Sequence, residues 1–220
     1  MHFLTGLGWL LAATMAGNEL PRGTVIPAVV CAKAPAFRYA LYLPKSLPAN
    51  GPVPLLLLFD PGGDGLGAVR RFQAAAEATG TALAGSLDSR NGLSWGQYTQ
   101  ILTAFWDDLG TRVPAGPRYV GGFSGGARIA LGLTLMHPGE IRGLFSAGAF
   151  YDVGTEPPAK GVAVYMICGE RDFNLPELRK AAIQLTHIGV PHRRDLFAGE
   201  HEWPPEAKCL EGLTYLRRST

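Results

Sequence analysis

Gly122-Phe123-Ser124-Gly125-Gly126 is the stretch of sequence that decides the fold. It follows a short β-type run at 118–122 and opens a helical pattern over 125–137. A serine on a sharp strand-to-helix turn sits in strained φ/ψ, and glycines two residues to either side let neighbouring backbone pass without a Cβ clash. The stretch therefore predicts a turn that presents the Ser124 hydroxyl, with the N–H of Gly125 facing the same point.

Outward from this turn, strand patterns alternate with helical patterns. Residues 37–43 alternate apolar and polar, which is typical of a half-buried strand and suggests an antiparallel edge of the sheet. Residues 53–59 are continuously apolar, as expected for a strand covered on both faces. Further strands are predicted at 81–86, 118–122, 143–149, 162–168 and 192–197, and helices at 66–79, 98–109, 125–137, 174–188 and 205–218. This order predicts an α/β fold with a mostly parallel sheet flanked by helices.

Composition sets the scale of the molecule and limits its partners. The chain has 220 residues, of which 47% are hydrophobic and 17% charged, as expected for a single domain over 17–220 with a large core. The formal net charge is only +2, and no concentrated basic stretch is present. Nucleic acid is therefore not an expected partner.

The first sixteen residues form an apolar segment with small residues near Ala16, where a signal peptidase could cut. The segment is too short to span a bilayer, so stable membrane insertion is not expected. No Lys or Arg precedes Arg22, although export signals usually carry such a charge; a buried N-terminal segment or a start site placed too far upstream are the alternatives. A cleaved leader over 1–16 predicts a secreted or periplasmic protein, and otherwise a cytoplasmic one.

A serine nucleophile needs a histidine base and a carboxylate that orients the imidazole. His201 follows the last predicted strand, where the carboxyl ends of parallel strands gather catalytic loops. Asp172 lies in the loop after the strand at 162–168, and Glu170 is its rival there. A purely structural role for Asp172, as the cap of the next helix, is the alternative. The favoured constellation is Ser124, His201 and Asp172.

The loop after the strand at 53–59 is the expected source of a second oxyanion donor beside Gly125. Pro61 has no N–H, so the donor is expected from Gly62 or Gly63, with an ordinary glycine turn as the alternative. Asp60 is expected to accept N–H bonds within this loop, because a carboxylate would oppose a growing negative charge.

Three aromatic or cationic side chains are candidates to contact substrate. Arg90 and Trp95 belong to a loop that should reach the same rim, and Trp203 follows His201 closely; packing within exposed loops is the alternative. No phosphate-binding glycine loop, cofactor motif or metal-ligand spacing is present in the sequence. Neither a cofactor nor a metal is therefore expected.

The three cysteines cannot all pair within one chain, and no activating histidine stands beside any of them in the sequence. Cys168 ends an apolar run and is expected to behave as a small core residue. A bridge between Cys31 and Cys209 is left open.

These residues resemble those of the α/β-hydrolase superfamily, in the chain order Ser, Asp, His. The run Gly199-Glu200-His201-Glu202-Trp203-Pro204 is similar to the ending of small esterases without a cap domain, related to polyhydroxybutyrate depolymerases, feruloyl esterases and secreted peptidase-like proteins. The resemblance implies an open site in which Ser124 is the nucleophile, His201 the base and Asp172 the orienting acid.

The activity that this resemblance implies is hydrolysis of a small-molecule or polymer ester through an acyl-enzyme. A peptidase, a thioesterase or a catalytically silent binding protein on the same fold are the alternatives. Two departures stand out. Asp60-Pro61 replaces the usual His-Gly of the oxyanion loop, and Glu200 places a carboxylate beside the histidine, which could raise its pKa and move activity to higher pH.

Overall fold

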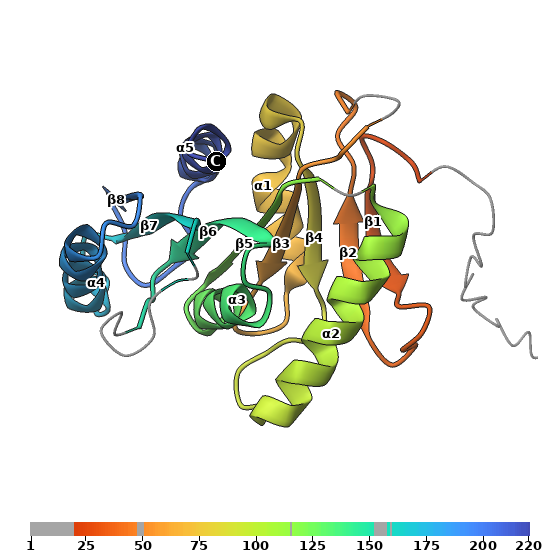
Figure 1. Ribbon diagram of the computed structural model, residues 1–220, viewed down its shortest axis with the longest axis horizontal. Coiled ribbons are helices and arrows are strands. Elements are labelled where there is room, and N and C mark those ends of the chain that lie inside the picture. Colours follow the sequence, from red (N-terminus) through yellow and green to blue (C-terminus); the bar gives the residue numbers. More distant parts are fainter. Residues whose placement is uncertain (1–19, 48–50, 115, 152–157, 159) are drawn as a thin grey trace, which may run out of the picture.

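The computed structural model describes residues 20–47, 51–114, 116–151, 158 and 160–220 (Figure 1). The leader predicted over 1–16 lies outside the described residues. The strands form one eight-stranded sheet in the order β1-β2-β4-β3-β5-β6-β7-β8. Their bounds are β1 Val25–Val30, β2 Arg38–Tyr42, β3 Leu55–Phe59, β4 Ala82–Ser86, β5 Arg118–Phe123, β6 Ile141–Ala147, β7 Ala163–Gly169 and β8 His192–Phe197.

The sheet is parallel from β4 to β8 and antiparallel at β1 and β2. This is the mostly parallel architecture that the alternating patterns predict. Strand β2 is antiparallel as expected, but it is not the edge of the sheet, because β1 pairs along its outer side. Strand β1 is not predicted by the sequence pattern, because Pro27 interrupts the pattern and the register of the strand shifts between Ile26 and Val29.

Helices cover both faces of the sheet, as Figure 1 shows. Their bounds are α1 Gly65–Thr79, α2 Trp95–Arg112, α3 Gly125–Met136, α4 Leu175–His187 and α5 Glu206–Arg218. Apolar side chains of α2, α3 and α4 pack with one face of the sheet, and those of α1 and α5 pack with the other. Central strand β3 has no residue more than 2% exposed, which explains its continuously apolar sequence.

Strand register brings the functional loops to one edge of the sheet. Phe59 at the end of β3 pairs with Gly122 in β5, and Gly169 at the end of β7 pairs with Phe197 at the end of β8. The carboxyl ends of these parallel strands are therefore level, and the loops that follow them lie side by side.

No cap domain is evident in the part of the chain that the structure describes: β6 and β7 are joined by residues 148–162, of which 152–157 and 159 lie outside that part. None of the described helices is long and apolar enough to cross a membrane.

The cysteines are all buried and free. Cys31 belongs to the core on one face of the sheet and Cys209 to the core on the other, so the bridge left open in the sequence analysis does not form. Burial raises the pKa of Cys31 and Cys168 to about 11 and that of Cys209 to about 12. These thiols are protonated at neutral pH and do not supply a thiolate nucleophile.

Candidate active site

Ser124 occupies the strained turn between β5 and α3. Its φ is 52° and its ψ is −122°, and it is the one non-glycine residue with positive φ among the described residues. Close packing of the turn requires the glycines on both sides: a Cβ at Gly126 would lie 2.2 Å from the carbonyl oxygen of Phe59, and a Cβ at Gly122 would lie 2.4 Å from Gly126. The strain at Ser124 is therefore maintained by β3, which packs directly beneath the turn.

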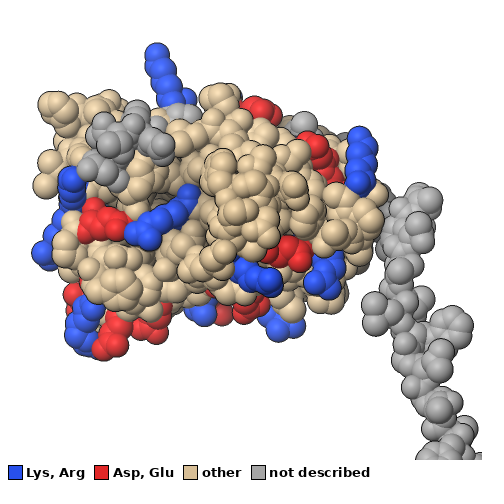
Figure 2. Space-filling model, turned by 90° about the horizontal axis from the view of Figure 1, so that it is seen from below, with Lys and Arg blue, Asp and Glu red and all other residues tan. Residues whose placement is uncertain are grey.

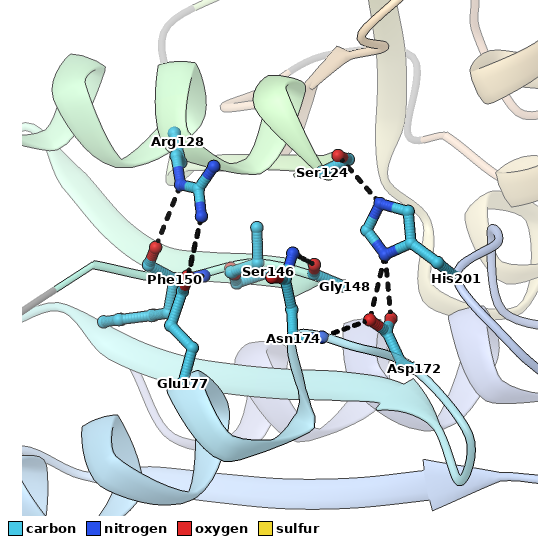
Figure 3. A network of polar contacts seen from close by, with 10 residues as sticks. Ser124, Arg128, Ser146, Gly148, Phe150, Asp172, Asn174, Glu177 and His201 are labelled. Atoms are coloured by element: carbon cyan, nitrogen blue, oxygen red, sulfur yellow. Dashed lines mark hydrogen bonds and ion pairs between the residues drawn. The ribbon is translucent and has the colours of Figure 1, made fainter.

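Ser124, His201 and Asp172 form a continuous chain of hydrogen bonds (Figure 3). Ser124 Oγ lies 3.0 Å from His201 Nε2. On the opposite side of the ring, His201 Nδ1 lies 2.9 Å from Asp172 Oδ1 and 3.0 Å from Oδ2. In the tautomer with the proton on Nδ1, the imidazole donates to the carboxylate and leaves Nε2 free to accept the serine proton.

The carboxylate of Asp172 is fixed in place by its own loop. The residue is 4% exposed, and its Oδ1 accepts the backbone N–H of Asn174 at 2.8 Å. Asn174 in turn donates its side-chain amide to the carbonyl oxygen of Gly148, the residue after β6. Asp172 is not the cap of α4, because the N-cap position is Asn174. The bonds made by Asp172 instead hold a buried carboxylate towards one imidazole.

Glu170 and the other described histidines have different surroundings. Glu170, the rival of Asp172, is exposed to solvent. His137 stacks on Trp106 with ring centroids 3.8 Å apart, and His192 bonds to the carbonyl oxygen of Val190. Among the histidines within the described residues, His201 is thus the one that contacts Ser124.

The loop after β3 uses its glycine N–H groups internally. Gly62 donates to Asp60 Oδ1 at 2.7 Å, and Gly63 donates to the carbonyl oxygen of Asp60 at 3.1 Å. Either glycine could bind an oxyanion only after the loop releases its N–H. Gly125, by contrast, begins α3, where the first N–H groups of a helix have no acceptor within the helix.

Asp60 joins this loop to the histidine loop. Its Oδ1 accepts N–H bonds from Gly62 and Asp64, as expected, and its Oδ2 accepts the indole N–H of Trp203 at 2.8 Å. The Trp203 ring packs against Phe72 and Phe123, with centroids 6.3 Å and 5.6 Å away. Trp203, a candidate for substrate contact, is thus turned inward and connects two loops of the site.

The other two candidates for substrate contact differ from each other. Arg90 is exposed, and its carbonyl oxygen accepts a bond from the Tyr98 hydroxyl. Trp95 is 58% exposed and reaches α3, since its ring lies 3.3 Å from where a Cβ of Gly132 would stand. Trp95 therefore lies over α3, the helix that follows Ser124.

Asn91 is a neighbour of the turn that sequence reasoning missed. Its backbone N–H bonds to the carbonyl oxygen of Pro61, and its side-chain oxygen lies 1.9 Å from where a Cβ of Gly125 would stand. Gly125, the first glycine after the serine, could have signalled this contact, because glycine there leaves space for a side chain from another loop.

Arg128 and Glu177 hold the segment after β6 (Figure 3). Arg128 Nε donates to the carbonyl oxygen of Phe150 at 3.1 Å, and Glu177 Oε1 accepts the Phe150 N–H at 2.5 Å. Arg128 Nη2 also donates to both carboxylate oxygens of Glu177, at 2.8 and 3.0 Å. Beside them is a cavity of about 500 Å³, lined by Arg128, Phe150, Tyr151, Pro176, Glu177 and Lys180.

Glu200, expected to place a carboxylate near the imidazole, forms an ion pair with Arg171 at 3.4 Å. Both side chains are 72% exposed. Water therefore screens the charge of Glu200 strongly.

Figure 2 looks onto the edge of the molecule where β3 and β4 end. Lys, Arg, Asp and Glu side chains are interspersed there, with a broad uncharged area between them. This face carries no field of a single sign that would select a strongly charged partner.

The strand order and the strained serine after β5 define the α/β-hydrolase fold. No family model and no curated protein sequence matches the chain. Solved structures do match it. The apoenzyme of S-formylglutathione hydrolase FrmB from Staphylococcus aureus has a TM-score of 0.72 at 13% identity, over 91% of this chain and 100% of that one.

Two esterases give similar superpositions. A ferulic acid esterase has a TM-score of 0.66 at 16% identity, over 89% of this chain and 98% of its own. A bacterial heroin esterase has a TM-score of 0.64 at 18% identity, over 83% of this chain and 78% of its own. At these identities the likeness establishes the fold, and the chemistry has to be argued from the site.

Proposed function

We propose that this protein is a serine esterase that hydrolyses carboxylic esters through an acyl-enzyme. The observation that carries the proposal is the unbroken chain from Ser124 Oγ through the His201 ring to Asp172, with bonds of 3.0 and 2.9 Å. That the structural neighbours include a serine hydrolase and esterases supports it.

In the first half-reaction, Ser124 Oγ attacks the ester carbonyl carbon while His201 Nε2 takes the hydroxyl proton. Asp172 stabilises the resulting imidazolium. The carbonyl oxygen becomes an oxyanion, and the expected donor to it is the N–H of Gly125, the first residue of α3. His201 then gives its proton to the alcohol oxygen, the bond from that oxygen to the acyl carbon breaks, and the acyl group remains on Ser124.

In the second half-reaction a water molecule takes the place of the alcohol. His201 removes a proton from the water, whose oxygen attacks the acyl carbon. Collapse of this second intermediate releases the carboxylic acid and returns the proton to Ser124 Oγ. Apart from the ester and this water, the proposed steps use only the side chains of Ser124, His201 and Asp172 and the N–H of Gly125.

Labelling with a fluorophosphonate tests the proposal, because this reagent phosphonylates an activated serine. We expect stoichiometric labelling of the wild type, none of Ser124→Ala, and wild-type labelling of the control Ser219→Ala, whose hydroxyl bonds to the carbonyl oxygen of Tyr215 at the C-terminus. Folded wild-type protein that resists the reagent would instead support a silent binding protein. Relative kcat/KM for acetyl esters, acetyl thioesters and aminoacyl amides then ranks the substrate classes.

A further inference from the structure

Phe173 is a large apolar side chain with no role in the reaction described above. It directly follows Asp172 and is 72% exposed. Its ring centroid lies 4.2 Å from that of His201, with an interplanar angle of 38°. Single exposed apolar side chains are common on protein surfaces, so it is the position of this ring against the His201 imidazole, and not its exposure alone, that points to a ligand.

Support for the imidazole does not account for this exposure. Phe123 already packs against His201, with centroids 4.8 Å apart, and Phe123 is itself covered by Trp203. Asp172 fixes the direction of the ring through Nδ1. With those contacts in place, most of the Phe173 ring still faces solvent and is free to contact substrate.

The chemistry of the reaction fixes which part of a substrate lies there. His201 Nε2 must protonate the leaving alcohol, so the alcohol oxygen comes within hydrogen-bond reach of Nε2, at roughly 3 Å. The group attached to that oxygen then starts beside the His201 ring. The acyl carbon is bonded to Ser124 Oγ at the same moment, and the acyl chain must leave in another direction. Phe173 therefore borders the alcohol side of the ester.

Resting on the proposed function, we propose that Phe173 determines alcohol specificity and that the protein acts on esters whose alcohol carries an aromatic ring. Such a ring can pack against Phe173 in an offset or edge-on arrangement. On the loops that carry Phe173 and His201, the exposed side chains of Arg171 and Glu200 pair with each other at 3.4 Å. They do not require an opposite charge on the alcohol.

The test uses two acetate esters, of ethanol and of 3-phenylpropanol. The acyl group is the same, so both pass through one acyl-enzyme, and the two alcohols have nearly equal acidity. We expect wild-type kcat/KM to favour the phenylpropyl ester by about 10-fold, from the apolar area covered. In Phe173→Ala this preference should fall to about 2-fold or less, with kcat/KM for ethyl acetate within about 3-fold of wild type.

Ile183→Ala is the matched control, because Ile183 is apolar, 73% exposed and lies within α4 rather than beside His201. It should keep the wild-type preference. An unchanged preference in Phe173→Ala would overturn the inference. So would an equal loss on both esters, which would mean that the ring only steadies the imidazole.

Failure of the underlying function has a different signature. A wild type that cleaves neither ester and resists the fluorophosphonate would reject the esterase and this inference with it. Labelling with the fluorophosphonate, combined with an alcohol preference that ignores Phe173, would reject the inference alone.

Discussion

Two buried aspartates, in different parts of the molecule, are used in opposite ways. Asp108 on α2 is 6% exposed, and its carboxylate accepts bonds from the Ala32 N–H, the Tyr39 hydroxyl and the Arg112 guanidinium, at 2.6 to 2.7 Å. Asp172 is 4% exposed, has no cation beside it in the described contacts, and faces His201. The charge of Asp108 is neutralised by Arg112. The carboxylate of Asp172 instead bonds to one nitrogen of the His201 ring, whose other nitrogen bonds to the Ser124 hydroxyl.

The difference shows in the pKa of Asp108. Burial alone would raise it, but hydrogen bonds from Arg112, Ala32 and Tyr39 outweigh burial and hold the pKa below its ordinary value. The network is closed, since it ties α2 to β2 and to the segment after β1. The Asp172 chain is open and ends on an oxygen that can react. A buried carboxylate thus stabilises the fold in one place and, in the proposed function, orients the base in the other.

The sharpest way to break this contrast is Asp172→Asn. Because Asn174 donates to Oδ1, the new amide nitrogen will take the position of Oδ2 and donate to His201 Nδ1. Nε2 then carries the ring proton and cannot accept one from Ser124. We expect kcat for p-nitrophenyl acetate to fall by about 10³-fold or more, with little change in thermal unfolding. Wild-type kinetics in this variant would remove Asp172 from the reaction.

Asp108→Ala is the converse change. It leaves the Ala32 N–H and the Tyr39 hydroxyl without their acceptor and deprives Arg112 of its partner. Because this site is buried, we expect the free energy of unfolding to fall by about 3 kcal/mol in urea denaturation. Below the unfolding transition, kcat/KM should stay within about 2-fold of wild type. A large kinetic loss without destabilisation would show that the two networks are coupled.

Of the two networks, only the one that contains Asp172 could be predicted from the sequence. Ser124, Asp172 and His201 stood out because each follows a strand of a parallel sheet, and register then brings such positions together. Asp108 gave no signal, since it lies in the middle of a helix and its partners come from β2 and from a hairpin whose first strand, β1, was itself missed. Contacts that depend on a bulged strand cannot be derived from local pattern.

In the loops, too, some features could be predicted from the sequence and others could not. The glycines around Ser124 were predicted from backbone sterics, whereas the internal bonds of Gly62 and Gly63 depend on where Asp60 turns its carboxylate. Trp203 was a candidate for substrate contact because of its type and position. Its inward orientation follows from Phe72 on α1, which is far away in sequence. Side-chain direction in a loop is set by such distant neighbours.

The pH dependence of the unfolding free energy tests the stabilising role of Asp108. A carboxyl group whose pKa is depressed in the folded protein contributes stability above its unfolded value and loses it as the pH falls through the folded pKa. With an ordinary value of 3.8, the contribution of Asp108 is complete well above pH 4 and is lost below it. The unfolding free energy of the wild type should therefore approach that of Asp108→Asn as the pH falls from 5 to 2.5. A constant difference across this range would show that Asp108 is not the titrating group.

The smallest expected effect is that of Trp203→Phe. This variant tests whether Asp60 only stabilises the fold, as Asp108 does, or supports the reaction, as proposed for Asp172. Phenylalanine keeps an aromatic ring against Phe72 and Phe123 but removes the indole N–H that bonds to Asp60 Oδ2. Because Asp60 keeps its bonds from Gly62 and Asp64, we expect a loss of only about 1 kcal/mol in urea denaturation.

Activity then decides between the two networks. If the bond between Asp60 and Trp203 positions the histidine loop, kcat for p-nitrophenyl acetate should fall by several-fold, and it should fall equally for ethyl and phenylpropyl acetate, because His201 serves both. Tyr215→Phe is the control: Tyr215 packs near Tyr165, with centroids 6.1 Å apart, on the same face of the sheet and away from the catalytic loops. Loss of stability without loss of kcat in Trp203→Phe would place Asp60 with Asp108, as a carboxylate that holds the fold and takes no part in the reaction.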